Sequence, residues 1–226
     1  MLIYKIGSDQ IVGEDQGAVK RRCQECSVSD SKEFFPATGM PDKDWWQTLW
    51  PEPGSVLQQI GIGGGMTVVD LCCGDGHFTS PLARLVSPGK VIAVDIDAAM
   101  IEQARNACAG WSNCEFVHAD ARDLARLSAA PADHVLIANT FHGVPDKTAL
   151  AQGAFSVLRQ AGRFTVINWY PLPREQTAVL GQPRGPATNL RMSPEAVIRT
   201  VEPAGFMIEQ IVDLPPYHYA AIFIRP

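Results

Sequence analysis

Residues 68–79 read VVDLCCGDGHFT and place several chemically capable groups in one short stretch. An aspartate, two adjacent thiols and two glycines follow one another: Asp70, Cys72, Cys73, Gly74 and Gly76. Thiolates bind soft metals and take part in redox chemistry. Glycines between a strand and a helix let the backbone approach a ligand, and the N–H groups that begin the helix attract anions. The stretch is therefore a candidate thiol site, metal site or nucleotide-binding turn.

Two more carboxylates stand at the ends of apolar runs. Asp95 ends residues 90–95, 19 residues after Gly76, and Asp120 ends residues 114–120. In a parallel α/β sheet the ligand lies above the carboxyl ends of the strands, where the strand order reverses. There one carboxylate can accept both hydroxyls of a ribose, and another can accept an adenine amino group. This pairing favours the nucleotide-binding turn.

The elements that would position these residues alternate regularly. Short β-branched apolar runs predict buried parallel strands at residues 66–71, 90–95, 114–120, 133–139 and 163–169. Helical patterns lie between them at residues 78–86, 97–109 and 146–162. Alternation at this spacing predicts a doubly wound, Rossmann-like α/β fold with a mostly parallel sheet and helices on both faces.

The flanking segments complete this prediction. Residues 42–60 carry two short helical patterns divided by Pro51 and Pro53. After a helix at residues 193–205, which begins at Ser193, two apolar runs are joined by a short turn and are expected to pair antiparallel: residues 206–214 and 218–224.

The chain is expected to form one domain, residues 42–226, preceded by an N-terminal arm or lid at residues 1–41. A long Pro- and Gly-rich segment, residues 170–192, is expected to be a functional loop.

Composition limits the partners. The net charge of −5 and the absence of a long basic run argue against nucleic acid. No run reaches the roughly 20 apolar residues of a membrane span, and no secretory leader is recognised at the start. Six cysteines without a regular framework resemble reduced thiols, which predicts a cytoplasmic location. Cys23 and Cys26 form half of a zinc-ligand spacing, but the second half is missing, so no metal is expected.

Four segments, taken in order, resemble a known family. VVDLCCGDGHF, VIAVDID, FVHADARDL and HVLIANTFHGVPD look like the successive signatures of the class I S-adenosylmethionine-dependent methyltransferases. They are most similar to the small-molecule branch that includes the ubiquinone and menaquinone methyltransferases. The resemblance covers roughly residues 67–224 and implies a seven-stranded sheet, a small-molecule acceptor and S-adenosyl-L-homocysteine as product.

The resemblance also implies the cofactor contacts. Asp70 would hold the methionine amino group, Asp95 the ribose, and Asp120 the adenine amino group. The other implied contacts are Cys72, Gly74, Gly76, Ile96, Ala121 and the backbone of Asn139. Cys72 stands where the family has glycine, which is compatible with binding if the backbone angles of Cys72 are ordinary.

Methyl transfer from a sulfonium needs orientation more than covalent help. Candidates for a general base are His142, Tyr217 and His218, although His142 could equally be a structural residue. Trp45, Trp46, Trp169 and Tyr170 could wall an apolar or aromatic acceptor, although the tryptophans near position 45 could simply pack a helix onto the sheet. Arg174, Arg184 and Arg191 could grip an anionic group or lie on the surface.

Three other hypotheses remain at this stage. Gly74-x-Gly76 followed by Asp95 also approximates the fingerprint of an NAD(P)-dependent oxidoreductase, but Thr79 replaces its third glycine. A regulatory or partner-binding module could bind the cofactor without turnover. Adjacent Cys72 and Cys73 could bind a thiol-seeking substrate such as a metalloid, or be packed thiols. The sequence leaves the acceptor and the oligomeric state open.

Overall fold

The structure is a computed structural model, and it describes residues 34–127 and 131–226. Residues 1–33 of the predicted arm therefore lie outside the described residues, and residues 34–41 lie within them. Seven strands form one sheet in the order β3-β2-β1-β4-β5-β9-β8. These strands are β1 Thr67–Leu71, β2 Lys90–Asp95, β3 Cys114–His118, β4 Ala132–Ala138, β5 Leu158–Trp169, β8 Met207–Leu214 and β9 His218–Ile224.

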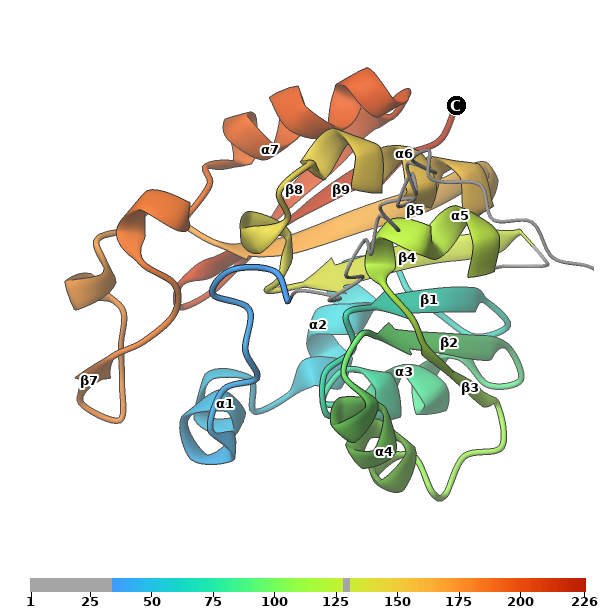
Figure 1. Cartoon of the computed structure of the whole chain (residues 1–226), viewed down its shortest axis with the longest axis horizontal. Helices are drawn as coiled ribbons and strands as arrows, with labels where there is room; N and C mark the ends of the chain where they lie inside the picture. The colour runs from blue at the N-terminus through green and yellow to red at the C-terminus, as the bar shows by residue number, and fades with distance from the viewer. Residues whose placement is uncertain (1–33, 128–130) are drawn as a thin grey trace, which may run out of the picture. The chain divides into compact units, whose positions relative to one another are not determined.

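The helices cover both faces of this sheet (Figure 1). Helices α1 to α4 lie on one side, with α5 to α7 on the other. Their bounds are α1 Lys43–Leu49, α2 Pro53–Gln59, α3 Thr79–Val86, α4 Ala98–Ala107, α5 Leu124–Leu127, α6 Lys147–Val157 and α7 Pro194–Val201. The predicted doubly wound α/β class is confirmed.

Strand direction follows from the connections. Strands β1 to β5 pair in parallel because a helix crosses over between most successive strands. Strand β9 runs antiparallel to both β5 and β8, and only the turn at residues 215–217 joins β8 to β9. The expected antiparallel pair at the end of the chain is confirmed.

The alternation of side chains in each strand produces two cores. Val68 and Val91 face the layer that contains α1, α2 and α3. Their neighbours Val69 and Ile92 face α6 and α7. Successive strand residues point to opposite faces, so a strand buried on both sides reads as a continuous apolar run. This is why the sequence marks these strands clearly.

Several helix starts match the sequence. The side chains of Asp97, Asp146 and Ser193 each accept a backbone N–H from the first turn of the helix that they precede. Pro53 begins α2, so the two prolines separate α1 from α2 as expected.

The helix predicted to reach Gly162 ends earlier, at Val157. Strand β5 then begins at Leu158, and its pairing with β4 slips between Leu158 and Arg163. Ala161 adopts a left-handed φ of 57° inside this irregularity. The helical pattern of residues 158–162 was misleading because pairing with β4 overrides the local propensity there.

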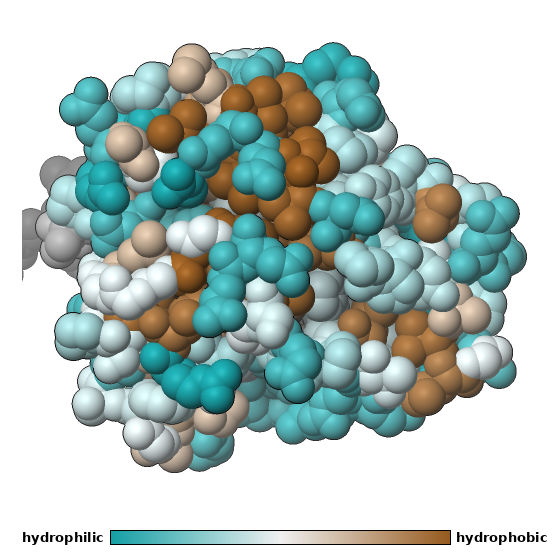
Figure 2. Space-filling view, turned by 180° about the vertical axis from the view of Figure 1, so that it is seen from behind, coloured by the Kyte–Doolittle hydropathy of each residue, from teal (hydrophilic) through white to brown (hydrophobic). Residues whose placement is uncertain are grey.

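The surface is mostly polar, with separate apolar patches. Figure 2 shows such patches on the face opposite to that of Figure 1, interrupted by hydrophilic side chains. Among the described residues, the large apolar side chains that remain exposed are Phe34, Trp111, Leu180, Met207 and Ile211. Within residues 34–127 and 131–226, no helix combines the length and apolar character that a membrane crossing requires.

The turn after β1 packs closely on α4, and Gly76 makes that contact possible. Gly76 has a φ of 87°, and a Cβ added to it would lie 2.8 Å from the Ala104 Cα. That distance is shorter than real Cβ contacts, and the clash is with helix backbone. Only glycine therefore allows α4 to approach this turn.

We expect Gly76→Ala to lower the free energy of unfolding by about 3 kcal/mol, because left-handed strain adds to a clash with α4. The matched control is Gly61→Ala, where φ is 81° and the added Cβ meets nothing within 4 Å. That control should cost only about 1 kcal/mol. Urea unfolding followed by tryptophan fluorescence measures both, and equal costs would contradict the role assigned to α4.

Candidate cofactor and acceptor site

A cavity of about 790 Å³ lies at the carboxyl ends of β1, β2, β4 and β5. The strand order reverses between β1 and β4, which is where ligands bind in open α/β sheets. Its volume is in the upper part of the range for small-molecule sites, about 300–1,000 Å³. The cavity brings together Asp70, Cys72, Gly74, Asp95, Ile96 and Asn139 from the predicted cofactor contacts.

Asp70 is a nearly buried carboxylate, 2% exposed, at the end of β1. Its Oδ2 accepts a hydrogen bond of 2.6 Å from the Thr79 hydroxyl at the start of α3. Burial raises the pKa of Asp70 from 3.8 to about 6, against the lowering effect of Thr79. A carboxylate destabilised in this way is suited to receive a cationic group.

Asp95 fixes the glycine turn. Its Oδ2 accepts the Gly74 N–H and its Oδ1 accepts the Asp97 N–H, both at 2.9 Å. Desolvation raises the pKa of Asp95, and these two backbone hydrogen bonds partly offset that increase. The carboxylate is thus held rigidly at the end of β2 and faces the cavity.

Cys72 was expected to be compatible with cofactor binding if its backbone angles were ordinary. They are not. Its φ is 61°, in the left-handed region that favours glycine. Residue 72 has a backbone conformation that is typical of glycine, although it carries a side chain. Cys72 is therefore strained. That side chain packs against the core on the α6 side of the sheet.

The two thiols are packed and protonated. Burial and the charges of Asp70 and Asp95 raise the pKa values of both Cys72 and Cys73. Reactive thiols need the opposite environment. In the part of the chain that the structure describes, no group of three or more His, Cys, Asp or Glu could hold a metal ion. Cys23 and Cys26 lie outside that part. Of the three possibilities for residues 68–79, the geometry favours the nucleotide-binding turn.

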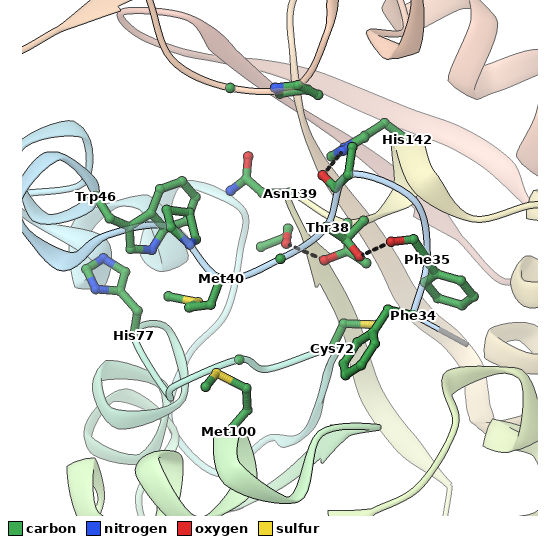
Figure 3. Close-up of a pocket in the computed structure, with 18 of the residues that line it drawn as sticks. Phe34, Phe35, Thr38, Met40, Trp46, Cys72, His77, Met100, Asn139 and His142 are labelled. Carbon is green, nitrogen blue, oxygen red and sulfur yellow. Dashed lines mark hydrogen bonds between the residues drawn. The ribbon is translucent and has the colours of Figure 1, made fainter. Parts of the chain in front are cut away.

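Asn139 follows β4 with a φ of 58° and lines the cavity (Figure 3). Its backbone N–H is already engaged with the Ile167 carbonyl. Both atoms of its side-chain amide are buried and lack a hydrogen-bond partner among the described residues. Buried polar atoms are normally satisfied. The side-chain amide of Asn139 is therefore available to a ligand, whereas the resemblance implied a backbone contact.

Residues 34–41, the part of the predicted N-terminal arm or lid that the structure describes, form a wall of the cavity, although the sequence singled out no residue among them. Met40 points into the cavity between Trp46 and Cys72 (Figure 3). A Cβ on Gly74 would lie 2.8 Å from the Met40 sulfur, so this segment rests directly on the turn. Further lining residues without a sequence signal are His77 and Met100.

His142, which follows β4, contacts the backbone of residues 34–41. Its Nε2 is 3.1 Å from the Ala37 carbonyl, its Nδ1 is buried, and the ring also interacts with the Asn168 side chain, which raises the pKa of His142. Burial has the larger effect and lowers the pKa of His142, so its ring is neutral near pH 7. A neutral ring next to a carbonyl donates through Nε2 and leaves Nδ1 as the acceptor.

The structure does not bring Tyr217 or His218 to the cavity. The Tyr217 hydroxyl donates to the Ala178 carbonyl, 2.9 Å away, and its ring stacks on Trp169. His218 is 1% exposed between Trp50 and Trp169, and burial lowers its pKa well below the usual range. Both side chains pack in the aromatic layer. Their place between the last two strands of the sequence could not show whether they pack there or reach the cavity.

Three predicted cofactor residues do not line the cavity. These residues are Gly76, Ala121 and Asp120, and the carboxylate of Asp120 is held by the Arg122 guanidinium with a shortest N–O distance of 2.5 Å. Asp120 also accepts the Arg122 N–H and begins the short helix η1 Ala121–Asp123. An adenine amino group would share this carboxylate with Arg122.

Of the residues predicted to contact the acceptor, some line the cavity and others do not. Trp45, Trp46 and Trp169 line the cavity together with Arg174 and Arg184. Tyr170 does not, and packs on Tyr219 with ring centroids 5.0 Å apart.

Arg191 is also absent from the lining, because it is buried inside the 170–192 loop. Its guanidinium donates to four acceptors in that loop: the carbonyls of Leu172, Arg184 and Pro186 and the hydroxyl of Thr177. The loop also contains the β6–β7 hairpin, Ala178–Val179 and Gln182–Pro183. Arg191 therefore fixes the loop from within.

Residues 62–191 match the family described as methyltransferase domain. The chain belongs to that family. A demethylmenaquinone methyltransferase from Staphylococcus aureus is 32% identical over 108 residues, which are 47% of this chain and 44% of that protein. The chain thus spans less than half the length of the curated relatives that it matches.

Solved structures agree on the fold. An S-adenosylmethionine-dependent methyltransferase from Aquifex aeolicus superposes with a TM-score of 0.69 at 22% identity, covering 82% of this chain and 95% of that one. An N-methyltransferase from Bradyrhizobium japonicum, solved with S-adenosyl-L-homocysteine, has a TM-score of 0.63 at 17% identity, with 82% and 93% covered. The resemblance to the class I S-adenosylmethionine-dependent methyltransferases is confirmed.

We expect Cys72→Gly to raise the free energy of unfolding by up to about 1 kcal/mol, because glycine removes the left-handed strain. Cys72→Val should lower it by about 2 kcal/mol, because a β-branched residue is worse there. Urea unfolding of both variants measures the difference. Destabilisation by glycine as large as that by valine would show that packing of the thiol outweighs backbone strain.

The burial of Asp70 makes the stability of the protein depend on pH. The folded-state pKa, about 6, lies above the unfolded value of 3.8, so the unfolded chain loses this proton first as pH rises. Stability therefore decreases from about pH 4 to pH 6, and the full cost, about 3 kcal/mol, applies above that range.

Asp70→Asn removes this cost and should stabilise the ligand-free protein by about 1–3 kcal/mol near pH 7.5 and hardly at all near pH 4. Urea unfolding of variant and wild type at the two pH values measures the difference. A gain of the same size at both pH values would contradict the raised pKa.

Proposed function

We propose that this protein transfers a methyl group from S-adenosylmethionine to a small-molecule acceptor. The observation that carries the proposal is the pair of carboxylates, Asp70 and Asp95, on either side of a glycine turn in one cavity. S-adenosylmethionine supplies a methyl group activated on a sulfonium sulfur. The residues present fit that cofactor, which combines cationic groups with a ribose.

Each residue has a distinct task in this proposal. Asp70 binds the methionine ammonium group, which stabilises its ionised form. Asp95 accepts the ribose hydroxyls, and Ile96 packs on the adenine. The unpartnered amide of Asn139 satisfies its hydrogen bonds on the methionine portion. Asp120 would contribute an adenine contact while it remains held by Arg122.

Transfer itself requires alignment of the acceptor with the methyl group. The acceptor's lone pair forms the bond to the methyl carbon, and the carbon–sulfur bond breaks with its electron pair on sulfur. A proton on an oxygen or nitrogen nucleophile leaves to solvent or to His142. His142 accepts it at Nδ1 in the tautomer that the Ala37 carbonyl selects.

An NAD(P)-dependent oxidoreductase fits this cavity less well. In that class the pyrophosphate lies over the first turn, on the N-terminus of the helix. Here the carboxylate of Asp70 lines the same turn and would repel a pyrophosphate. The buried acid therefore favours a cationic ligand over an anionic one.

Isothermal titration of the wild type with S-adenosylmethionine, S-adenosyl-L-homocysteine and NAD tests the cofactor. We expect both sulfur compounds to bind and NAD not to. Asp95→Ala should weaken S-adenosylmethionine binding at least about tenfold, since it removes charge-assisted hydrogen bonds. Asp146→Ala is the matched control, because that carboxylate also accepts a backbone N–H but lies outside the cavity.

Unchanged affinity in Asp95→Ala, or binding of NAD alone, would refute the assignment. Release of S-adenosyl-L-homocysteine in the presence of phenols, quinols, amines and thiols then tests turnover. Cofactor binding without turnover on any of them would support a regulatory or partner-binding module instead.

A further inference from the structure

Two arginines of the 170–192 loop, Arg174 and Arg184, line the cavity. The Arg184 guanidinium carbon lies 5.2 Å from the Trp45 ring centroid, and its Nε is buried without a partner among the described residues. The Arg174 Nε donates to the Gly185 carbonyl at 3.0 Å. Both guanidinium groups are thus oriented by the protein at the wall of the cavity.

Neither arginine forms an ion pair with a carboxylate in residues 34–127 or 131–226. Five other arginines in the same part of the chain do so, namely Arg105, Arg122, Arg126, Arg159 and Arg163, whereas Arg84, Arg191, Arg199 and Arg225 do not line the cavity and form none. In a chain with a net charge of −5, two cavity arginines that lack a carboxylate indicate a site for an anion.

The two signs of charge are separated within the cavity. Asp70 and Asp95 end β1 and β2, whereas the arginines belong to the loop that follows β5. Strand β4 lies between β1 and β5, and strands are about 4.8 Å apart, so the ends of β1 and β5 are roughly 10 Å from each other. A cation and an anion can therefore be bound at opposite ends of one cavity.

Much of the cavity lining is aromatic. Phe34, Trp45, Trp46 and Trp169 all contribute to the lining, and Figure 3 shows Phe34 and Trp46 among these side chains. Indole and phenyl edges favour contact with another aromatic ring, which adds to simple apolar burial. A planar ring suits this wall better than a flexible chain, which would lose more conformational freedom on binding.

We propose that the methyl acceptor is an aromatic carboxylate, whose ring packs on the aromatic wall and whose carboxylate binds Arg174 and Arg184. The inference rests on the proposed function, since it assigns the acceptor of the same site. The carboxylate serves as an anchor, because an arginine fork binds such an anion with two parallel hydrogen bonds. Arg191 acts indirectly by fixing the loop that presents both arginines.

The test compares acids with their neutral amides. 3,4-Dihydroxybenzoate and 1-hydroxy-2-naphthoate, and the primary amide of each, are titrated into the protein with and without saturating S-adenosyl-L-homocysteine, with tryptophan fluorescence as readout. We expect at least one acid to bind about tenfold or more tightly than its amide, and this preference to decrease as salt is added.

Arg174→Gln and Arg184→Gln should each reduce the preference, and the double variant should abolish it. The matched control is Arg199→Gln, because Arg199 is an exposed residue of α7 outside the cavity. S-adenosyl-L-homocysteine affinity, measured on the same proteins, should stay unchanged.

Equal binding of acid and amide, no binding at millimolar concentration, or a preference that survives in the double variant would overturn the proposal. Reduced S-adenosyl-L-homocysteine affinity in the arginine variants would overturn it as well, because the arginines would then hold the cofactor's carboxylate. If the wild type fails to bind the cofactor, the proposed function fails, and the acid–amide comparison without cofactor still reports on the anion site.

Discussion

The hydrogen bond from the Gly74 N–H to the Asp95 carboxylate ties the turn after β1 to the end of β2. The turn is left-handed at Cys72, Gly74 and Gly76, a shape that would not persist without such contacts. With the turn held, Asp70 remains buried at its base and α4 can pack against Gly76. The cavity therefore depends on a link between strand ends that are far apart in sequence.

Much of the fold and the acidic half of the site could be predicted from sequence. Strands such as β1 and β2 are buried on both faces, so their residues form unmistakable apolar runs. Parallel strands bring their carboxyl ends to one edge, which is why Asp70 and Asp95 could be placed together before any coordinates. The family resemblance, and not strand geometry, pointed to Asn139, which follows β4 and lines the cavity.

The remainder depends on contacts that leave no local pattern. Met40 reaches Gly74 from a segment without helical or strand periodicity. No pattern in the sequence distinguishes Arg184 from Arg191. Arg184 nevertheless lines the cavity, whereas Arg191 is enclosed by backbone carbonyls. His218 and His142 differ in the same way, because burial between two indoles is decided by tertiary packing. The left-handed angle of Cys72 is likewise set by the turn and not by the residue.

The enclosed position of Arg191 has a consequence for divergence within the family. The Arg191 side chain donates to three backbone carbonyls of the loop, so these contacts do not depend on the side chain of Arg184, which lines the cavity. The side chain at position 184 can then change in charge, size or polarity while these hydrogen bonds of the loop stay the same. Relatives that keep an arginine at position 191 could acquire new acceptors by one or two substitutions, without having to rebuild the loop.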